Sequence, residues 1–379
     1  MIPLRVLHLV ESLRPTAGSV ATVLPGLFKA LADRGWTSTV ATRDVPPEST
    51  DGVDVTSCSP DAITQPMRSA NVVHVHGGER AFLSSILPAI RRSAVPCVFA
   101  PLGALCPNPF EADDWRNAMA DWFFRRRLRR TATIFAAANE AERHELAKRR
   151  IGPSVKMLAY GIDPHAFDEA AGDATDGDSA SISDGDATGH RRYILMSAPI
   201  DPIEGIVPLL RAVAELGYEH RDCHVVLAGP SRGDWKAQLD AAIERKGFTD
   251  RTTMVIDPDA DTQAAWIRRA AVLAAPGLRI RPAFSVLQAL AAGVPVVTTR
   301  DASPGAAHDL VHVCRPERHA LRQALSEVLL RTDHERRRDA PIARDRARGS
   351  LSWDQLVGKW VATYLEATRT KTGSATPAA

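Results

Sequence analysis

The chain has 379 residues, more than one ordinary hydrophobic core needs and enough for two α/β domains. Its 24% charged and 45% hydrophobic residues are ordinary for a globular protein, and a formal net charge of +2 gives no global electrostatic support for a nucleic-acid partner. The five cysteines are scattered without metal-ligand spacing, which favours buried thiols in a reducing compartment over a disulfide framework.

The first predicted elements are a buried strand at residues 4–10, a turn-rich loop at 14–19 and a helix through residue 31. The apolar start is too short for a signal peptide, and no window approaches the length of a membrane span, so we expect a cytoplasmic protein. A strand-to-helix turn that needs glycine for its geometry accounts for Gly18 in this loop.

Residues 71–78, NVVHVHGG, predict a strand that ends in two glycines. Alternation places His74 and His76 on one face, with His76 nearer the carboxyl end of the strand, where ligand sites form in parallel sheets. His76 is therefore the candidate catalytic residue, and a packing or hydrogen-bonding histidine is the alternative. A metal would need a third ligand, which the sequence does not place nearby, so no metal is expected.

Residues 114–130, DWRNAMADWFFRRRLRR, predict an amphipathic helix. The apolar side chains Trp115, Met119, Trp122 and Phe123 lie opposite a cluster of arginines. Such a helix either rests on an acidic membrane surface or packs a single apolar stripe on the core with its arginines in water.

The composition shifts to Asp, Gly, Ala, Ser and Thr at 168–190, which predicts a flexible acidic linker. In the second half, residues 271–299 predict a strand, a loop, a helix ended by Gly293 and a second strand. Ligands of such βαβ units bind in the loop beyond the first strand. The loop at 276–284, which carries Arg279 and Arg281, is therefore the predicted ligand loop.

The segments QALAAGVPVV at 288–297, HVHGG at 74–78 and the tryptophan-led helix at 353–365 resemble the family 4 (group 1) glycosyltransferases. The resemblance implies a GT-B fold, in which two Rossmann-like, doubly wound α/β domains face an inter-domain cleft and a C-terminal helix crosses back to the first domain. The domains are then 1–167 on the acceptor side and 191–348 on the nucleotide-sugar side. The crossover helix spans 349–368, and a disordered tail spans 369–379.

The resemblance also implies which residues bind the donor, and the sequence departs from the family at several of them. The family's Arg and Lys for the diphosphate become Pro199 and Glu204, although Gly205 is kept. Small residues in the family's first loop let a phosphate or an acceptor approach the backbone, and Gly18 keeps that smallness, although a turn glycine explains it equally well. The family's paired glutamates for the sugar and the ribose become Ile280 and Gln288. A basic residue or histidine before a glycine becomes Leu102.

Each hydrogen bond to a charged group contributes roughly 1.5–3 kcal/mol, so the loss of two would cost about 10² to 10⁴ in affinity or rate. We hypothesise that Arg279 or Arg281 takes over phosphate binding, and Gln288 could still bond a ribose hydroxyl. Arginines exposed on a loop are the alternative interpretation.

These residues predict a glycosyltransferase with a remodelled donor site, acting on a nucleotide sugar and a glycan or lipid-linked acceptor. A peripheral position on the inner face of the membrane would suit such an acceptor, and no cofactor is expected. The alternative is a catalytically inactive pseudoenzyme that binds a glycan, a nucleotide or a partner protein. A sugar-nucleotide epimerase is weaker, because it too needs carboxylates and cations in the cleft.

Overall fold

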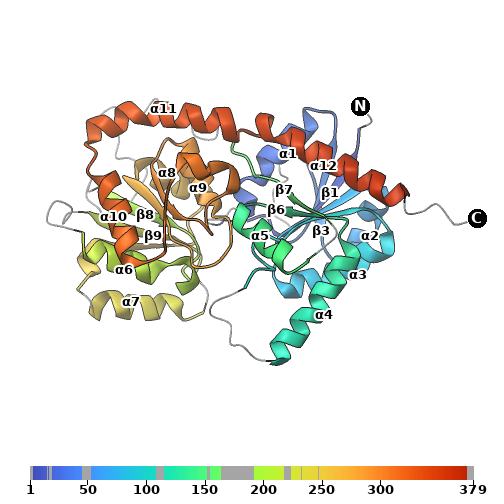
Figure 1. Cartoon of the computed structure of the whole chain (residues 1–379), viewed down its shortest axis with the longest axis horizontal. Helices are drawn as coiled ribbons and strands as arrows, with labels where there is room; N and C mark the ends of the chain where they lie inside the picture. The colour runs from blue at the N-terminus through green and yellow to red at the C-terminus, as the bar shows by residue number, and fades with distance from the viewer. Residues whose placement is uncertain are drawn as a thin grey trace, which may run out of the picture.

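Two parallel β-sheets with their flanking helices make up the computed structural model of the chain, and they lie side by side along its long axis (Figure 1). The structure describes residues 3–14, 16, 19–44, 53–107, 115–151, 154–163, 192–216, 223–231, 233–245 and 247–373. The predicted linker at 168–190 and Gly18 both fall outside the described residues.

The N-terminal sheet has the strand order β3-β2-β1-β4-β5-β6-β7, with parallel pairing throughout. Its strands are β1 Arg5–Ser12, β2 Thr37–Asp44, β3 Asp54–Ser57, β4 Val72–His76, β5 Cys97–Ala100, β6 Ile134–Ala137 and β7 Val155–Met157. Its helices are η1 Val20–Thr22, α1 Leu24–Ala32, α2 Pro60–Ser69, α3 Arg80–Ser93, α4 Trp115–Thr131 and α5 Glu140–Lys148. Strands β4, β5 and β6 are buried along their whole length, as expected for a parallel sheet with both faces covered.

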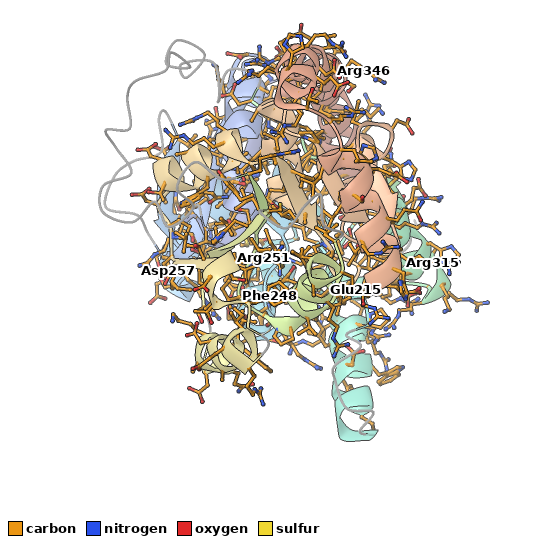
Figure 2. All side chains as sticks on the ribbon, turned by 90° about the vertical axis from the view of Figure 1, so that its left-hand side faces the viewer. Glu215, Phe248, Arg251, Asp257, Arg315 and Arg346 are labelled. Carbon is orange, nitrogen blue, oxygen red and sulfur yellow. The ribbon has the colours of Figure 1, made fainter. Side chains whose placement is uncertain are left out.

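The second sheet has the order β10-β9-β8-β11-β12-β13 and is also parallel. Its strands are β8 Tyr193–Ser197, β9 His224–Gly229, β10 Thr252–Ile256, β11 Val272–Ala275, β12 Val296–Thr299 and β13 His312–Cys314. The helices of this half are η2 Pro202–Glu204, α6 Ile206–Ala214, α7 Trp235–Arg245, η4 Thr249–Arg251, α8 Ala260–Arg269, α9 Phe284–Ala291, η5 Gly305–Leu310, α10 Arg318–Leu329 and α11 Asp333–Leu351. Beside β10, the Arg251 guanidinium lies 5.3 Å from the centre of the Phe248 ring (Figure 2).

The helix α12, Trp353–Gly373, returns the chain to the N-terminal half and packs on α1 (Figure 1). It is fixed there by three buried aromatic side chains, Trp353, Trp360 and Tyr364. The indole nitrogen of Trp360 donates to the Ala159 carbonyl at 2.9 Å. One continuous hydrophobic cluster contains residues of both sheets and of α12, so this helix joins the two halves.

Two details of α12 differ from the sequence-based prediction. The helix begins at Trp353 rather than at residue 349, because Ser352 is extended and pairs with Ile162. It also continues to Gly373, so residues 369–373 are helical rather than disordered.

The face that α4 turns to the core is not the predicted one. Met119, Trp122 and Phe123 are 53%, 55% and 54% exposed, whereas Phe124 and Leu128 are buried. The interpretation of α4 as a helix whose named apolar stripe packs on the core is therefore wrong for these three side chains. Figure 1 shows the reason, since α4 extends away from the body of the N-terminal half.

Candidate functional site

A cleft of about 1580 Å³ lies between the two halves. The N-terminal half contributes the segments that follow β1, β4 and β5, together with one face of α4. The second half contributes the segments that follow β8, β9 and β11. The cleft therefore lies beyond the carboxyl ends of strands from both sheets, where ligands bind in doubly wound folds.

The cleft wall carries a strong excess of positive charge. Nine arginines and five carboxylates line it, although the whole chain is nearly neutral. The arginines are Arg14, Arg80, Arg125, Arg126, Arg129, Arg130, Arg149, Arg279 and Arg281. A concave surface of one charge concentrates ligands of the opposite charge, so this cleft suits an anion.

Arg279 and Arg281 converge on one oxygen of Glu204. The distances from a guanidinium nitrogen to Glu204 Oε1 are 3.6 Å for Arg279 and 3.3 Å for Arg281. The side chains of the two arginines are 30% and 31% exposed, and that of Glu204 is 14% exposed. Both guanidinium groups are therefore paired with one carboxylate oxygen in the wall of the cleft.

The backbone around this ion-pair cluster is fixed by close contacts. The Leu278 N–H donates to the Ile203 carbonyl at 2.9 Å, which ties the arginine loop to η2. Gly205 has φ +85°, and a Cβ there would lie 2.3 Å from the Pro276 carbonyl oxygen. The glycine is therefore required by local geometry, and it does not line the cleft, so its predicted donor contact stays a prediction.

Two of the other predicted positions do face the cleft, namely Pro199 and Leu102. Leu102 has φ 51°, an uncommon conformation for a side chain of this size, and its side chain lies against Gly77. Neither side chain can bond a phosphate or a sugar hydroxyl.

The remaining two positions are turned elsewhere. Gln288 accepts a hydrogen bond from Gln263 Nε2 at 3.0 Å and does not line the cleft. Ile280 does not line it either, and its carbonyl oxygen would lie 2.3 Å from a Cβ on Gly103 in the facing half. The two positions that the resemblance assigns to the paired glutamates therefore do not line this cleft.

A buried carboxylate that the sequence analysis missed positions the loop after β5. Glu142 accepts hydrogen bonds from the backbone N–H of Gly103 at 2.7 Å and of Ala138 at 2.8 Å. Burial raises the pKa of Glu142 to about 7, although the two hydrogen bonds lower it. Because Gly103 faces Ile280, this carboxylate fixes the loop that meets the second half.

His76 lines the cleft but is only 1% exposed. Its Nδ1 is 2.9 Å from the Tyr160 hydroxyl, and its Nε2 is 3.0 Å from His8 Nδ1. Burial, followed by the charges of His74 and His8, keeps the pKa of His76 well below its usual value. A substrate contact, as predicted for a catalytic His76, requires one of these two bonds to open.

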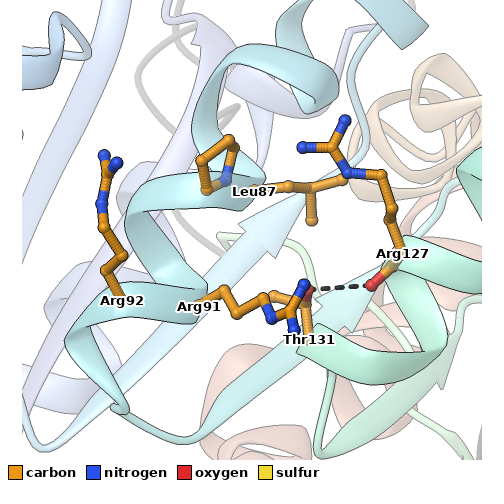
Figure 3. A pocket seen from close by; sticks show the side chains of 6 residues that line it. Leu87, Arg91, Arg92, Arg127 and Thr131 are labelled. Carbon is orange, nitrogen blue, oxygen red and sulfur yellow. Dashed lines mark hydrogen bonds between the residues drawn. The ribbon is translucent and has the colours of Figure 1, made fainter.

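A smaller pocket of about 350 Å³ lies between α3 and α4, outside the cleft (Figure 3). Arg91, Arg92 and Arg127 line it, and the Thr131 hydroxyl donates to the Arg127 carbonyl at 2.9 Å. The arginines of α4 therefore border both this pocket and the cleft.

Comparison with solved structures defines the class of fold. HepE of Anabaena, in complex with UDP and glucose, is similar with a TM-score of 0.70 and 15% identity over 95% of this chain and 100% of that chain. Sucrose-phosphate synthase from Thermosynechococcus elongatus is similar with a TM-score of 0.69 and 14% identity over 97% of this chain and 100% of that chain. The α,α-trehalose-phosphate synthase (UDP-forming) from Burkholderia vietnamiensis is similar with a TM-score of 0.68 and 15% identity over 96% of this chain and 100% of that chain. The chain has the α/β GT-B fold, which confirms the predicted fold class.

The match to a family is more local. Residues 191–330 match the model of the family "Glycosyl transferases group 1", which confirms the resemblance seen in the sequence. No curated protein sequence matches the chain. None of the described helices is long and apolar enough to cross a membrane.

Proposed function

We propose that this protein is a glycosyltransferase that binds a nucleotide-sugar donor in the cleft, with the diphosphate against Arg279 and Arg281. The observation that carries the proposal is the convergence of both guanidinium groups on Glu204 in the wall of the cleft. The solved structures similar to this chain include complexes of HepE with UDP and with UDP-glucose. We assign the donor to the second domain, 191–348, and the acceptor to the first, 1–167.

The arginine pair meets the main chemical demand of the reaction. When the sugar leaves the donor, negative charge develops on the diphosphate, and a site without a metal must stabilise it with basic side chains or helix N-termini. In this chain Pro199 and Glu204 replace the family's cations on one side of the loop, and Arg279 and Arg281 supply cations from the other. The diphosphate would displace the Glu204 carboxylate, which then faces water in the cleft.

Calorimetric titration with UDP and with UDP-glucose tests this proposal. We expect Arg281→Ala to weaken nucleotide affinity at least tenfold, because it removes one charge-assisted bond of roughly 1.5–3 kcal/mol. Arg268→Ala is the matched control, since Arg268 is exposed on α8 in the same half and does not line the cleft. Equal affinities of wild type and Arg281→Ala would reject the arginine site.

The acceptor that we propose is a glycan or glycolipid presented at an anionic membrane surface. The side chains of Met119, Trp122 and Phe123 are exposed on α4, and the Arg126 guanidinium lies 5.4 Å from the Trp122 ring centre. Aromatic side chains next to arginines favour the interface of a bilayer with anionic lipids. Because α4 also lines the cleft, an acceptor at that surface would be close to the donor.

Cosedimentation with vesicles tests the membrane contact. We expect the full chain to bind vesicles that contain phosphatidylglycerol and not vesicles of phosphatidylcholine alone. Replacing Met119 and Phe123 by serine should reduce binding at least tenfold, because buried apolar area contributes about 0.8 kcal/mol per CH₂ group. Trp235→Ser is the control, since Trp235 is 40% exposed in the other half. Equal binding by both variants would reject α4 as the contact.

The second candidate function is a non-catalytic binding module. It is favoured by Gln288 and Ile280, which present no carboxylate to the cleft. A transferase would release UDP from a nucleotide sugar when an acceptor or water is present. A binding module would bind UDP with the same arginine dependence and release none from the sugar donor.

A further inference from the structure

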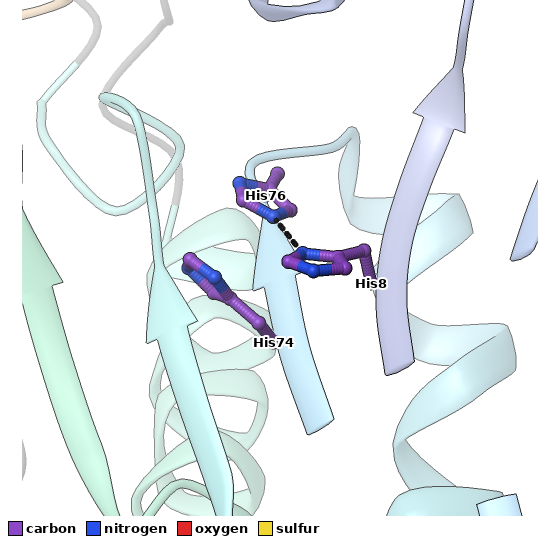
Figure 4. Close-up of side chains that lie close together, drawn as sticks. All are labelled: His8, His74 and His76. Atoms are coloured by element: carbon purple, nitrogen blue, oxygen red, sulfur yellow. Dashed lines mark hydrogen bonds between the residues drawn. The ribbon is translucent and has the colours of Figure 1, made fainter. Parts of the chain in front are cut away.

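Three buried histidines lie together on one face of the N-terminal sheet (Figure 4). His8 comes from β1, and His74 and His76 come from β4. The two strands are neighbours and parallel, with His8 directly opposite His74 in the register. All three side chains are at most 1% exposed, so the sheet places three imidazoles in one volume shielded from water.

Hydroxyl groups of two tyrosines orient two of the rings. The Tyr364 hydroxyl is 2.7 Å from His74 Nδ1, and the Tyr160 hydroxyl is 2.9 Å from His76 Nδ1. In both rings this contact leaves Nε2 as the other nitrogen. Histidines that bind metals usually have one ring nitrogen fixed by an oxygen in this way, while the other faces the ion.

The remaining nitrogens lie within reach of a common point. One ring nitrogen from each histidine lies within 4.8 Å of the other two, and His8 Nδ1 is 3.0 Å from His76 Nε2. Within the described chain, His74 Nε2 is buried without a hydrogen-bond partner. A buried polar atom without a partner is uncommon and calls for an explanation, and an ion bound by His74 Nε2 would provide one.

The state of protonation also suits a metal ligand, which must be a neutral imidazole. Burial lowers the pKa of His8 to about 3. Burial and the neighbouring histidines hold the pKa of His74 and of His76 well below the usual value. All three rings are therefore neutral at physiological pH.

We propose that His8, His74 and His76 bind one divalent transition-metal ion of the Zn²⁺ type through their ring nitrogens. Three histidine ligands that leave a fourth position open are an established zinc arrangement. At Zn–N distances of about 2.0–2.1 Å, tetrahedral geometry puts ligand nitrogens roughly 3.3 Å apart. The nitrogens of His8 and His76 are already near that separation, at 3.0 Å. The His74 ring would therefore move to bring its nitrogen to the same distance from the ion.

The ligand set also determines which ion is bound. Imidazole nitrogens suit Zn²⁺, Ni²⁺ and Cu²⁺, whereas Mg²⁺ and Ca²⁺ require oxygen ligands. Two aromatic rings lie next to the cluster. The centre of the Phe28 ring is 4.9 Å from that of His8, and the centre of the Trp360 ring is 5.0 Å from that of His74. His76 borders the cleft, which provides a route of entry for the ion. The ion would connect β1, β4 and, through Tyr364, the helix α12.

Metal titration of the full-length protein, after removal of metal with a chelator, tests the site. We expect one Zn²⁺ per chain in competition with a chromophoric chelator. We also expect His8→Gln and His74→Gln each to weaken binding at least tenfold. His224→Gln is the matched control, because His224 is buried on β9 in the other half and bonds Thr253 at 2.8 Å. The proposal is overturned by no binding to wild type, or by equal binding to wild type and both cluster variants.

A second measurement does not depend on how well the variants fold. Cobalt bound to the wild-type protein, with water in the open fourth position, should give the intense visible absorption of a four-coordinate site. X-ray absorption should show nitrogen and oxygen neighbours without sulfur. Sulfur neighbours would place the ion at one of the five cysteines and overturn the proposal. Tyr364→Phe keeps all three ligands but removes the hydroxyl that orients His74, so it should weaken Zn²⁺ binding about tenfold to 100-fold.

Discussion

The arginine cluster in the cleft wall and the histidine cluster on one face of the N-terminal sheet show two ways in which this fold places polar groups. Arg279, Arg281 and Glu204 are partly exposed, and both arginines form an ion pair with the same carboxylate oxygen. The three histidines are fully buried, and their pKa values are lowered until they are neutral. The first cluster pairs opposite charges at a partly exposed place, whereas burial disfavours the charged form of the three imidazoles.

The largest effect should follow from removing the packing around the histidines. Trp360 is fully buried between Tyr160 and the histidine rings. Trp360→Ala should lower the free energy of unfolding by about 3–5 kcal/mol, as large-to-small core substitutions do. Chemical denaturation measures this change. Trp235→Ala, at a 40% exposed position, is the control and should change it by less than about 0.5 kcal/mol. Similar losses in both variants would contradict the buried role of Trp360.

Glu142 extends the comparison, because burial raises the pKa of this carboxylic acid toward neutral pH. Its pKa is raised from 4.5 to about 7. The folded state therefore binds this proton more tightly than the unfolded state, so its contribution to stability is complete below pH 4.5. That contribution is lost as the pH rises through 7, by roughly 3 kcal/mol in total.

Glu142→Gln cannot ionise, and it isolates this contribution. The stability of wild type relative to Glu142→Gln should fall as the pH rises from 4.5 to 8. Denaturant unfolding at several pH values measures the difference between the two proteins, in which the histidine contributions cancel. A difference that stays constant across this range would show that Glu142 is ionised throughout.

The arginine cluster should contribute much less to stability than the buried groups. Arg279→Ala and Arg281→Ala should each change the free energy of unfolding by no more than about 1 kcal/mol, because partly exposed ion pairs contribute little. Thermal or denaturant unfolding measures this. A loss comparable to that of Trp360→Ala would mean that the cluster is a structural element of the fold rather than a ligand site.

The fold could be predicted further than the site. Apolar runs such as residues 72–76 and 296–299 predict buried parallel strands, because the pattern is local to each strand. The direction of a loop side chain depends on distant contacts. Gln288 is turned toward Gln263, and Ile280 is placed by the approach of Gly103 from the other half. No local pattern contains those contacts.

The histidine cluster could be predicted less directly than the strands but more directly than the loop side chains. His8 has the same parity in its strand as the buried Val6 and Val10, and doubly wound sheets commonly place the first strand beside the fourth. That topology was enough to bring a third histidine next to His74 and His76. The expectation that no third ligand lies nearby is therefore wrong. The face of α4 could not be predicted in the same way, because its surroundings decide which of two apolar sets is buried.

Calorimetric titration of Glu204→Gln with UDP tests the central claim most directly. If Glu204 occupies the phosphate position between Arg279 and Arg281, removing its charge frees both arginines. Nucleotide affinity should then rise roughly fivefold, or about 1 kcal/mol. An affinity that is unchanged or weaker than that of wild type would contradict an anion site formed by these two arginines.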